Sequence, residues 1–194
     1  MTHEVPEIDL STSALLLMDL QEGILANYGG GATLVSKVQE VLHKARKRKI
    51  TVGFVRVGFE ESDYQNVPDR NKAFSGISAT KKFPAEAPES QIASELTPLA
   101  GEIVVRKVRH GAMSTTNLHE QLQARGIDTL ILAGIATSGV VLSTVRDAAD
   151  KDYRIFVIED LCIDGDPQVH EVLMGKVFPR QAWIINSSQF LSMI

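Results

Sequence analysis

Short apolar runs alternate along the chain with segments whose apolar residues recur every three to four positions. The apolar runs are Ala14 to Met18, Thr51 to Val57, Ile103 to Val105, Thr129 to Ala133, Ile155 to Ile158 and Ala182 to Ile185. Runs of this kind are typical of strands that are buried on both faces of a parallel sheet. The helical spacing between them is carried by Leu34, Val35, Val38, Val41, Leu42 and Ala45, by Leu118 and Leu122, and by Val141, Leu142, Val145 and Ala149. The alternation predicts a three-layer α/β/α sandwich with a mainly parallel, Rossmann-like sheet of about six strands.

The stretch from Gly58 to Pro98 interrupts this pattern with several prolines, a run of acidic residues and no clean period. We expect a long excursion there, with a short helix near Glu89 to Leu96. Long ordered loops in compact domains often carry function, so this excursion is expected to cover a site or to contact a partner subunit. No repeat, low-complexity tract or linker divides the chain, which predicts a single domain over residues 1–194.

Composition narrows the classes of protein that fit. The 194 residues are 44% hydrophobic, which is enough for a proper core. A net charge of −4 and a short basic cluster that suits a helix C-terminus argue against nucleic acid as a partner. The single cysteine excludes a disulfide framework and fits a reducing compartment, so we expect a cytoplasmic protein. No signal pattern or apolar run of roughly 18 residues is present, so no membrane association is expected.

Candidate chemistry lies directly after the apolar runs, because ligands of open parallel sheets bind beyond the carboxyl ends of the strands. Asp19 follows the first run, Lys107 follows the third, and the segment GIATSGVVLST at 134 to 144 follows the fourth. Taken singly, Asp19 is more typical of a helix N-cap or a solvent-facing loop acid, and Lys107 is one of 20 basic residues. The small residues of the third segment permit close backbone approach, and its helix start is expected to present free N–H donors to an anion. Together the three positions predict one shared site.

Four blocks, in order, resemble the isochorismatase-like, or cysteine hydrolase, family. They are ALLLMDLQEGI at 14 to 24, VVRKVRHGAMSTTNL at 104 to 118, LILAGIATSGVVLSTVRDAADKDY at 130 to 153, and EDLCIDGDPQVHEVLMGKVFPRQA at 159 to 182. The resemblance covers nearly the whole chain. It implies the same sandwich fold, a small-molecule substrate or ligand, no cofactor, and a homo-oligomer.

Family members that hydrolyse amides use an Asp, a Lys and a Cys as their catalytic triad, and the resemblance matches Asp19 and Lys107 to the first two. The cysteine falls six residues after the glycine of its motif, which counts from Gly134 to Val140. A valine cannot be acylated, because it has neither a lone pair nor a titratable proton.

The resemblance also implies a cis peptide near Ile135–Ala136 that aims a backbone N–H at an oxyanion. Ile135, Ala136, Gly139 and Val140 are then the expected substrate-binding or oxyanion residues.

Three other residues are candidates for the missing nucleophile. Cys162 follows the fifth apolar run and is expected to serve structural packing. Ser138 and Ser143 lie two residues before and three after Val140 on a helix expected to start near Ser138, so neither shares the direction of that side chain.

No metal is expected. Family nicotinamidases place an Asp and His metal site in the excursion after the second strand, but residues 58–98 contain no histidine. Among the scattered histidines, His110 is close in sequence to the candidate site and is interpreted as a polar loop residue rather than a proton shuttle. Arg70, Asn71 and Lys72 resemble a family segment near the active-site mouth and are candidates for binding an anionic substrate.

Two functions from different classes remain open. Isochorismatases provide the precedent for the first, because they carry glycine at the cysteine position and hydrolyse a vinyl ether without a covalent intermediate. On that precedent the chain hydrolyses a vinyl ether or a C–N bond with Asp19 as the acid, while Lys107 orients Asp19 or binds a substrate carboxylate. The alternative is a catalytically inactive protein that holds a small molecule or serves as an oligomeric scaffold.

Overall fold

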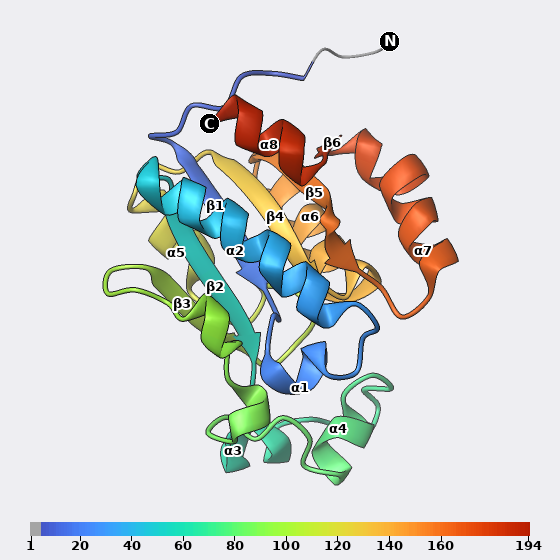
Figure 1. The fold of residues 1–194 in the computed structure, drawn as a ribbon. Helices are drawn as coiled ribbons and strands as arrows, with labels where there is room; N and C mark the ends of the chain where they lie inside the picture. The colour runs from blue at the N-terminus through green and yellow to red at the C-terminus, as the bar shows by residue number, and fades with distance from the viewer. Residues whose placement is uncertain (1–4) are drawn as a thin grey trace.

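A six-stranded, fully parallel sheet forms the centre of the protein, in a computed structural model that describes residues 5–194 (Figure 1). The strands are β1 Ser13–Met18, β2 Thr51–Val57, β3 Ile103–Lys107, β4 Thr129–Ile135, β5 Arg154–Ile163 and β6 Trp183–Ile185. Their order is β3-β2-β1-β4-β5-β6, and each neighbouring pair is parallel. The predicted sheet is confirmed, and each strand overlaps its predicted apolar run, although β3 and β5, among others, extend beyond theirs.

Helices cover both faces of the sheet, as expected. In Figure 1, α2 (Gly31–Lys47) and α8 (Ser187–Met193) lie in front of the sheet, and α5 (Leu118–Gln123) and α6 (Leu142–Ala149) lie behind it. Side chains of a strand point alternately to opposite faces. Accordingly, Leu15 and Leu17 of β1 belong to the apolar cluster under α2, whereas Leu16 belongs to the cluster under α5 and α6.

The excursion lies beyond the carboxyl ends of the strands, at the bottom of Figure 1. It contains α3 (Glu61–Gln65) and α4 (Ser75–Ala79), which the pattern did not predict. The expected helix near Glu89 to Leu96 is wrong, since two 3₁₀ turns, Pro88–Ser90 and Ser94–Leu96, occupy that stretch. Helices of five residues are too short to show a periodicity, and a reciprocal capping box between Glu60 and Asp63 starts α3 instead.

The remaining helical segments are short and lie between the strands and the longer helices along the chain. They are α1 Glu22–Leu25, α7 Pro167–Val172, π-helical turns at Thr137–Val141 and Leu173–Val177, and a 3₁₀ turn at Phe178–Arg180. No helix among residues 5–194 is long and apolar enough to cross a bilayer.

Cys162 was expected beyond the fifth strand, but it lies within β5, which continues past Ile158 after a shift in its register with β4.

The strand order reverses between β1 and β4, which is where open α/β sheets bind their ligands. Gly134 lies near the end of β4 with φ +151°, and a Cβ there would come within 2.2 Å of the Met18 carbonyl oxygen. Only glycine therefore allows β4 to lie this close to the end of β1. The peptide bond between Ile135 and Ala136 is cis, which confirms what the family resemblance implied.

Candidate functional site

Asp19 lies at the tip of β1 in a conformation that turns the chain sharply. Its φ is +57°, which is unusual for a residue with a side chain. Its backbone N–H donates to the Val55 carbonyl oxygen of β2 at 2.8 Å, which holds the turn against the neighbouring strand. The Asp19 side chain is buried, with the residue only 5% exposed. A carboxylate is thus held inside the protein at the switch point of the sheet.

Lys107 ends β3, and its side chain reaches Asp19 past the strand between them. The distance from Lys107 Nζ to Asp19 Oδ2 is 2.8 Å, and Nζ also donates to the Arg109 carbonyl oxygen at 3.1 Å. Lys107 is 3% exposed, so solvent ions screen this pair little. Asp19 Oδ1 is equally buried and has no hydrogen-bond partner among residues 5–194. The structure therefore brings together the two charged residues that the sequence nominated and leaves one carboxylate oxygen without a partner.

Burial decides the protonation of Asp19. Loss of water raises the pKa of this carboxyl above its usual value, and this effect exceeds the opposing effects of the Lys107 charge and hydrogen bond. A raised pKa increases the fraction of the neutral acid at a given pH. Asp19 is thus better suited to donate a proton than a carboxyl on the surface.

Val140 lies in the π-helical turn Thr137–Val141, directly after the cis peptide. The residue is 2% exposed and belongs to the same apolar cluster as Met18 at the end of β1 and Ala112. Segments with π-helical hydrogen bonding are rare in proteins, and those that occur are often at functional sites. An aliphatic side chain is therefore buried at the tip of β4, the strand that pairs with the one leading to Asp19.

The expectation of free N–H donors at this helix start is wrong for three of them. Ser138 N–H donates to Asp164 Oδ2 at 2.6 Å, and the N–H groups of Gly139 and Val141 donate to the Ala136 carbonyl oxygen at 3.1 and 3.3 Å. The sequence segment DGDP that contains Asp164 is typical of a turn, and its carboxylate folds back onto the π-helical turn. A substrate anion would have to compete with that carboxylate here.

Tyr28 lies within the electrostatic reach of Asp19 and Asp164, and no sequence pattern indicated this. The pKa of Tyr28 is raised chiefly by burial, and then by the negative charges of Asp164 and Asp19, so the phenol lies within their electrostatic reach. Tyr28 belongs to no recognisable local motif, and the turn motif of Asp164 does not indicate its influence on Tyr28, which comes from a segment distant in sequence.

Three other candidates, two serines and a histidine, lie at or near the surface. Ser138 is exposed, and Ser143 lies near Gly111 on a surface cavity that Asp147 also lines. His110 is exposed and contacts the edge of the Phe74 ring at a centroid distance of 4.7 Å.

In the excursion, Asn71 Oδ1 accepts a hydrogen bond from Phe74 N–H at 3.2 Å at the start of α4. Asn71 therefore has a structural role, whereas Arg70 and Lys72 are exposed. Within residues 5–194, no group of three or more His, Cys, Asp or Glu side chains is arranged to hold a metal ion.

Cys162 is held in the interior of the sheet. The residue is 4% exposed and belongs to the apolar cluster behind the sheet. Burial, the largest influence, raises the pKa of its thiol to about 12. A thiol of this kind is almost entirely protonated near neutral pH and is a poor nucleophile.

We accordingly expect native Cys162 to react negligibly with an aromatic disulfide reagent at pH 8, and to react fully after unfolding. The Cys162→Ala variant should retain wild-type turnover, because a buried thiol that stays protonated is a poor nucleophile. Rapid labelling of the folded protein, coupled to loss of turnover, would identify Cys162 as a replacement nucleophile after all.

Comparisons with known proteins agree with this architecture. Residues 13–189 match the family model described as the isochorismatase domain. The isochorismatase family protein YwoC of Bacillus subtilis is 31% identical over 187 residues, covering 96% of each chain. The ureidoacrylate amidohydrolase RutB of Stutzerimonas stutzeri is 27% identical over 206 residues, covering 95% of this chain and 79% of the relative. An isochorismatase family protein from Burkholderia thailandensis superposes with a TM-score of 0.82 at 27% identity, covering 98% of each chain.

The fold is that of a doubly wound α/β protein with a buried Asp–Lys pair at its switch point. The chain belongs to the isochorismatase family of hydrolases.

Proposed function

We propose that this hydrolase cleaves a small molecule without a covalent enzyme intermediate, with Asp19 as the group that moves the proton. The observation that carries the proposal is the buried Asp19–Lys107 pair, in which Oδ2 is held at 2.8 Å by the ammonium and Oδ1 has no protein partner among the described residues. An unpaired oxygen on a buried carboxyl is costly unless something else uses it. A substrate or the reacting water is the natural partner.

The absence of a thiol at position 140 supports the noncovalent route. By family resemblance, Val140 occupies the position of the nucleophile of the amide-cleaving members, and the buried Cys162 is a poor substitute because its pKa is about 12. Water must then attack the substrate directly.

The proton balance is the same for both candidate bonds. With a vinyl ether, neutral Asp19 protonates the terminal carbon of the double bond, water adds to the resulting oxocarbenium ion, and the proton of that water returns to the carboxylate. The hemiketal then collapses to a carbonyl compound and an alcohol. With an amide or ureido bond, the Asp19 carboxylate takes a proton from the attacking water and passes it to the leaving nitrogen. Each route consumes one water and regenerates Asp19.

Lys107 acts through position and charge in this scheme. Its ammonium fixes Oδ2 and stabilises the carboxylate form that appears after proton donation. The relative RutB is an ureidoacrylate amidohydrolase, which favours compounds with a ureido C–N bond as the first substrates to test beside vinyl ethers.

A catalytically inactive small-molecule-binding or scaffold protein is the second candidate. The observation in its favour is that Asp19, Lys107 and Val140 are all at least 95% buried. Such burial leaves little room for a substrate without a shift of the covering segments. The two functions differ in turnover, which is measured directly with panels of vinyl ethers, amides and ureido compounds. Hydrolysis supports the proposal, and tight binding without hydrolysis supports the alternative.

Substitution of Val140 by cysteine tests the noncovalent route. We expect Val140→Cys to form an acyl adduct with amide or ureido substrates, visible as a mass increase of the intact protein, because it returns a thiol to the family position. The wild-type protein should show no adduct.

The matched control is Val141→Cys. Val141 is equally buried in the same turn, but a neighbouring residue on a helix projects in a different direction. An adduct on the wild-type protein, or equal adducts on both variants, would contradict the assignment of position 140.

A further inference from the structure

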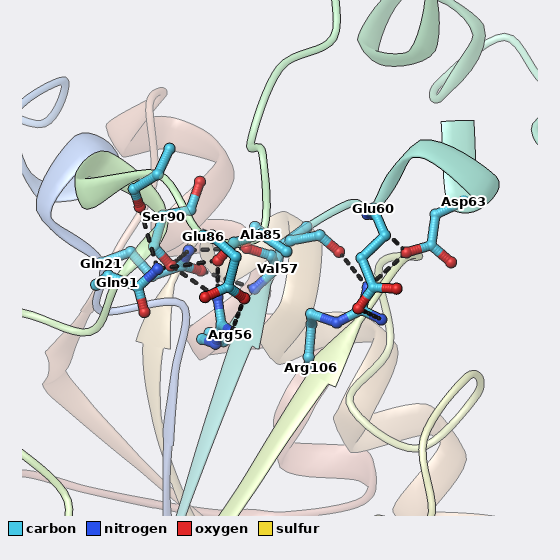
Figure 2. A network of polar contacts seen from close by, with 12 residues as sticks. Gln21, Arg56, Val57, Glu60, Asp63, Ala85, Glu86, Ser90, Gln91 and Arg106 are labelled. Atoms are coloured by element: carbon cyan, nitrogen blue, oxygen red, sulfur yellow. Dashed lines mark hydrogen bonds and ion pairs between the residues drawn. The ribbon is translucent and has the colours of Figure 1, made fainter. Parts of the chain in front are cut away.

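Gln21 lies two residues after Asp19 and is completely buried. Its side-chain amide makes three hydrogen bonds to backbone groups, which Figure 2 shows. Nε2 donates to the Val57 carbonyl oxygen at 2.8 Å and to the Ser90 carbonyl oxygen at 2.7 Å, and Oε1 accepts from the Val57 N–H at 2.7 Å. Both amide donors and the amide oxygen are therefore used, all on main-chain atoms.

Two of these bonds extend the pairing of the β1 segment with β2 beyond its last backbone hydrogen bond. The hydrogen bond from Asp19 N–H to the Val55 carbonyl oxygen is where the chain leaving β1 turns away from β2. Two residues further along each strand, the Gln21 amide binds both main-chain groups of Val57, the last residue of β2. A side chain thus replaces the backbone pairing that the turn at Asp19 removes.

Val57 is also the residue that pairs with Lys107. It lies opposite Lys107 in the β2–β3 register, and Gly58 N–H donates to the Lys107 carbonyl oxygen at 3.2 Å. Asp19 and Lys107 come from strands on either side of β2, and adjacent strands are roughly 4.8 Å apart. The distance between the two charged groups therefore depends on how the end of β2 is held. Gln21 holds that end from the side of Asp19.

The third bond closes the excursion over the same point. Ser90 belongs to the excursion, and backbone hydrogen bonds from Glu22 N–H to Gln91 O (3.1 Å) and from Ala93 N–H to Leu20 O (3.0 Å) flank it. The segment that follows Asp19 is thereby paired with the excursion. Gln21 and Ser90 are completely buried in this arrangement, and Val57 at the end of β2 is 6% exposed.

We propose that Gln21 is a positioning residue that holds Asp19 and Lys107 in register across the end of β2 and excludes water from the pair. Its effect on catalysis rests on the proposed function, but its effect on Asp19 does not. Gln21 itself transfers no proton, because an amide does not titrate in this range.

The test compares Gln21→Leu with the matched variant Gln91→Leu. Gln91 is also a glutamine whose Nε2 donates to two backbone carbonyl oxygens, those of Ala85 (2.9 Å) and Ala87 (3.1 Å), but it binds neither β1 nor β2 through its side chain. Both variants lose excursion contacts. Only Gln21→Leu also releases the end of β2.

Two readouts separate positioning from general destabilisation. For Gln21→Leu we expect kcat to fall by about 10- to 100-fold with little change in KM, since small displacements of catalytic groups have effects of this size. In proteins labelled with ¹³C at the aspartate carboxyl carbon, with Asp19→Asn used for assignment, the NMR titration midpoint of Asp19 should move down toward its ordinary value. Burial is the larger influence on the pKa of this carboxyl, so admitted water lowers it. Gln91→Leu should show neither change.

Gln21→Glu serves if the leucine variant does not fold. The new carboxyl keeps the shape and the acceptor for Val57 N–H, but when ionised it faces two carbonyl oxygens, and when protonated it restores one donor. Its kcat relative to wild type should therefore recover as the pH falls.

The titration needs no substrate, which keeps the two proposals apart. An Asp19 shift in a protein without turnover supports the positioning role and contradicts the proposed function. An active protein in which Gln21→Leu and Gln91→Leu behave alike in both readouts overturns the positioning role alone.

Discussion

Replacing Asp19 by asparagine should lower the turnover rate by about 10²- to 10⁴-fold, the contribution typical of a positioned acid or base. Asparagine has nearly the same shape and can still accept the hydrogen bond of Lys107, which lies 2.8 Å from Asp19 Oδ2. It cannot release or accept a proton as a carboxyl does. The measurement is kcat and KM for the best substrate of the panel, with the unfolding transition as a check that the variant is folded.

The pH dependence of the wild-type enzyme follows from the same group. Acid-assisted cleavage needs neutral Asp19, so kcat/KM should fall as the pH rises through the raised pKa of this carboxyl. For a C–N substrate that needs the carboxylate as base, the profile rises over the same range. The sign of the slope therefore distinguishes the two chemistries.

Asp160→Asn is the matched control. Asp160 also pairs with a lysine, Lys37 at 3.0 Å, and it accepts hydrogen bonds from Ser187, but it lies on β5 at a half-buried position apart from the proposed site. Its activity should match the wild type. Full activity of Asp19→Asn would remove Asp19 from the mechanism, and a loss in Asp160→Asn of the same size would make the effect nonspecific.

The parts of the fold that the sequence predicted are those governed by local pattern. A strand buried on both faces must be apolar throughout, so Thr51–Val57 was delimited correctly from composition alone. The end of β5 was missed because Glu159 and Asp160 interrupt the apolar run, although the strand continues to Ile163 after its register with β4 shifts. That shift is a tertiary feature without a local signal.

In the candidate site, too, the residues that follow a general rule were predicted from the sequence, and those that depend on tertiary contacts were not. Asp19 and Lys107 were found by a rule about strand ends, which is a property of parallel sheets in general. The occupied N–H of Ser138 was missed because its partner Asp164 lies 26 residues away. The bonds of Gln21 connect residues 36 and 69 positions apart, so nothing in the local sequence around MDLQ distinguishes this amide from a surface one. The local sequence pattern does not reveal a side chain whose hydrogen-bond partners are backbone groups of distant segments.

The second large effect concerns stability. Replacing Lys107 by methionine should reduce the free energy of unfolding at pH 7 by about 3–5 kcal/mol, the usual consequence of leaving one member of a buried ion pair without its partner. Lys107 and Asp19 are 3% and 5% exposed, so water cannot readily compensate the remaining carboxylate. Lys37→Met is the control, because its pair with Asp160 is largely solvated and should contribute less than about 1 kcal/mol.

The deficit of Lys107→Met should also depend on pH, with a defined sign. Burial already raises the pKa of Asp19 in the folded protein above 3.8, the value expected in the unfolded chain, and removal of the Lys107 charge raises it further. Folding then takes up a proton, so this contribution to stability is present below 3.8 and is lost as the pH rises through the folded pKa. Urea unfolding at pH 4 and pH 7, each relative to wild type, should give the smaller deficit at pH 4.

In the double variant Asp19→Asn/Lys107→Met the buried charge is absent, and most of the stability should return at both pH values. A double variant as unstable as Lys107→Met, with the same deficit at both pH values, would mean that lost packing of the lysine stem, rather than the ion pair, supports this part of the sheet.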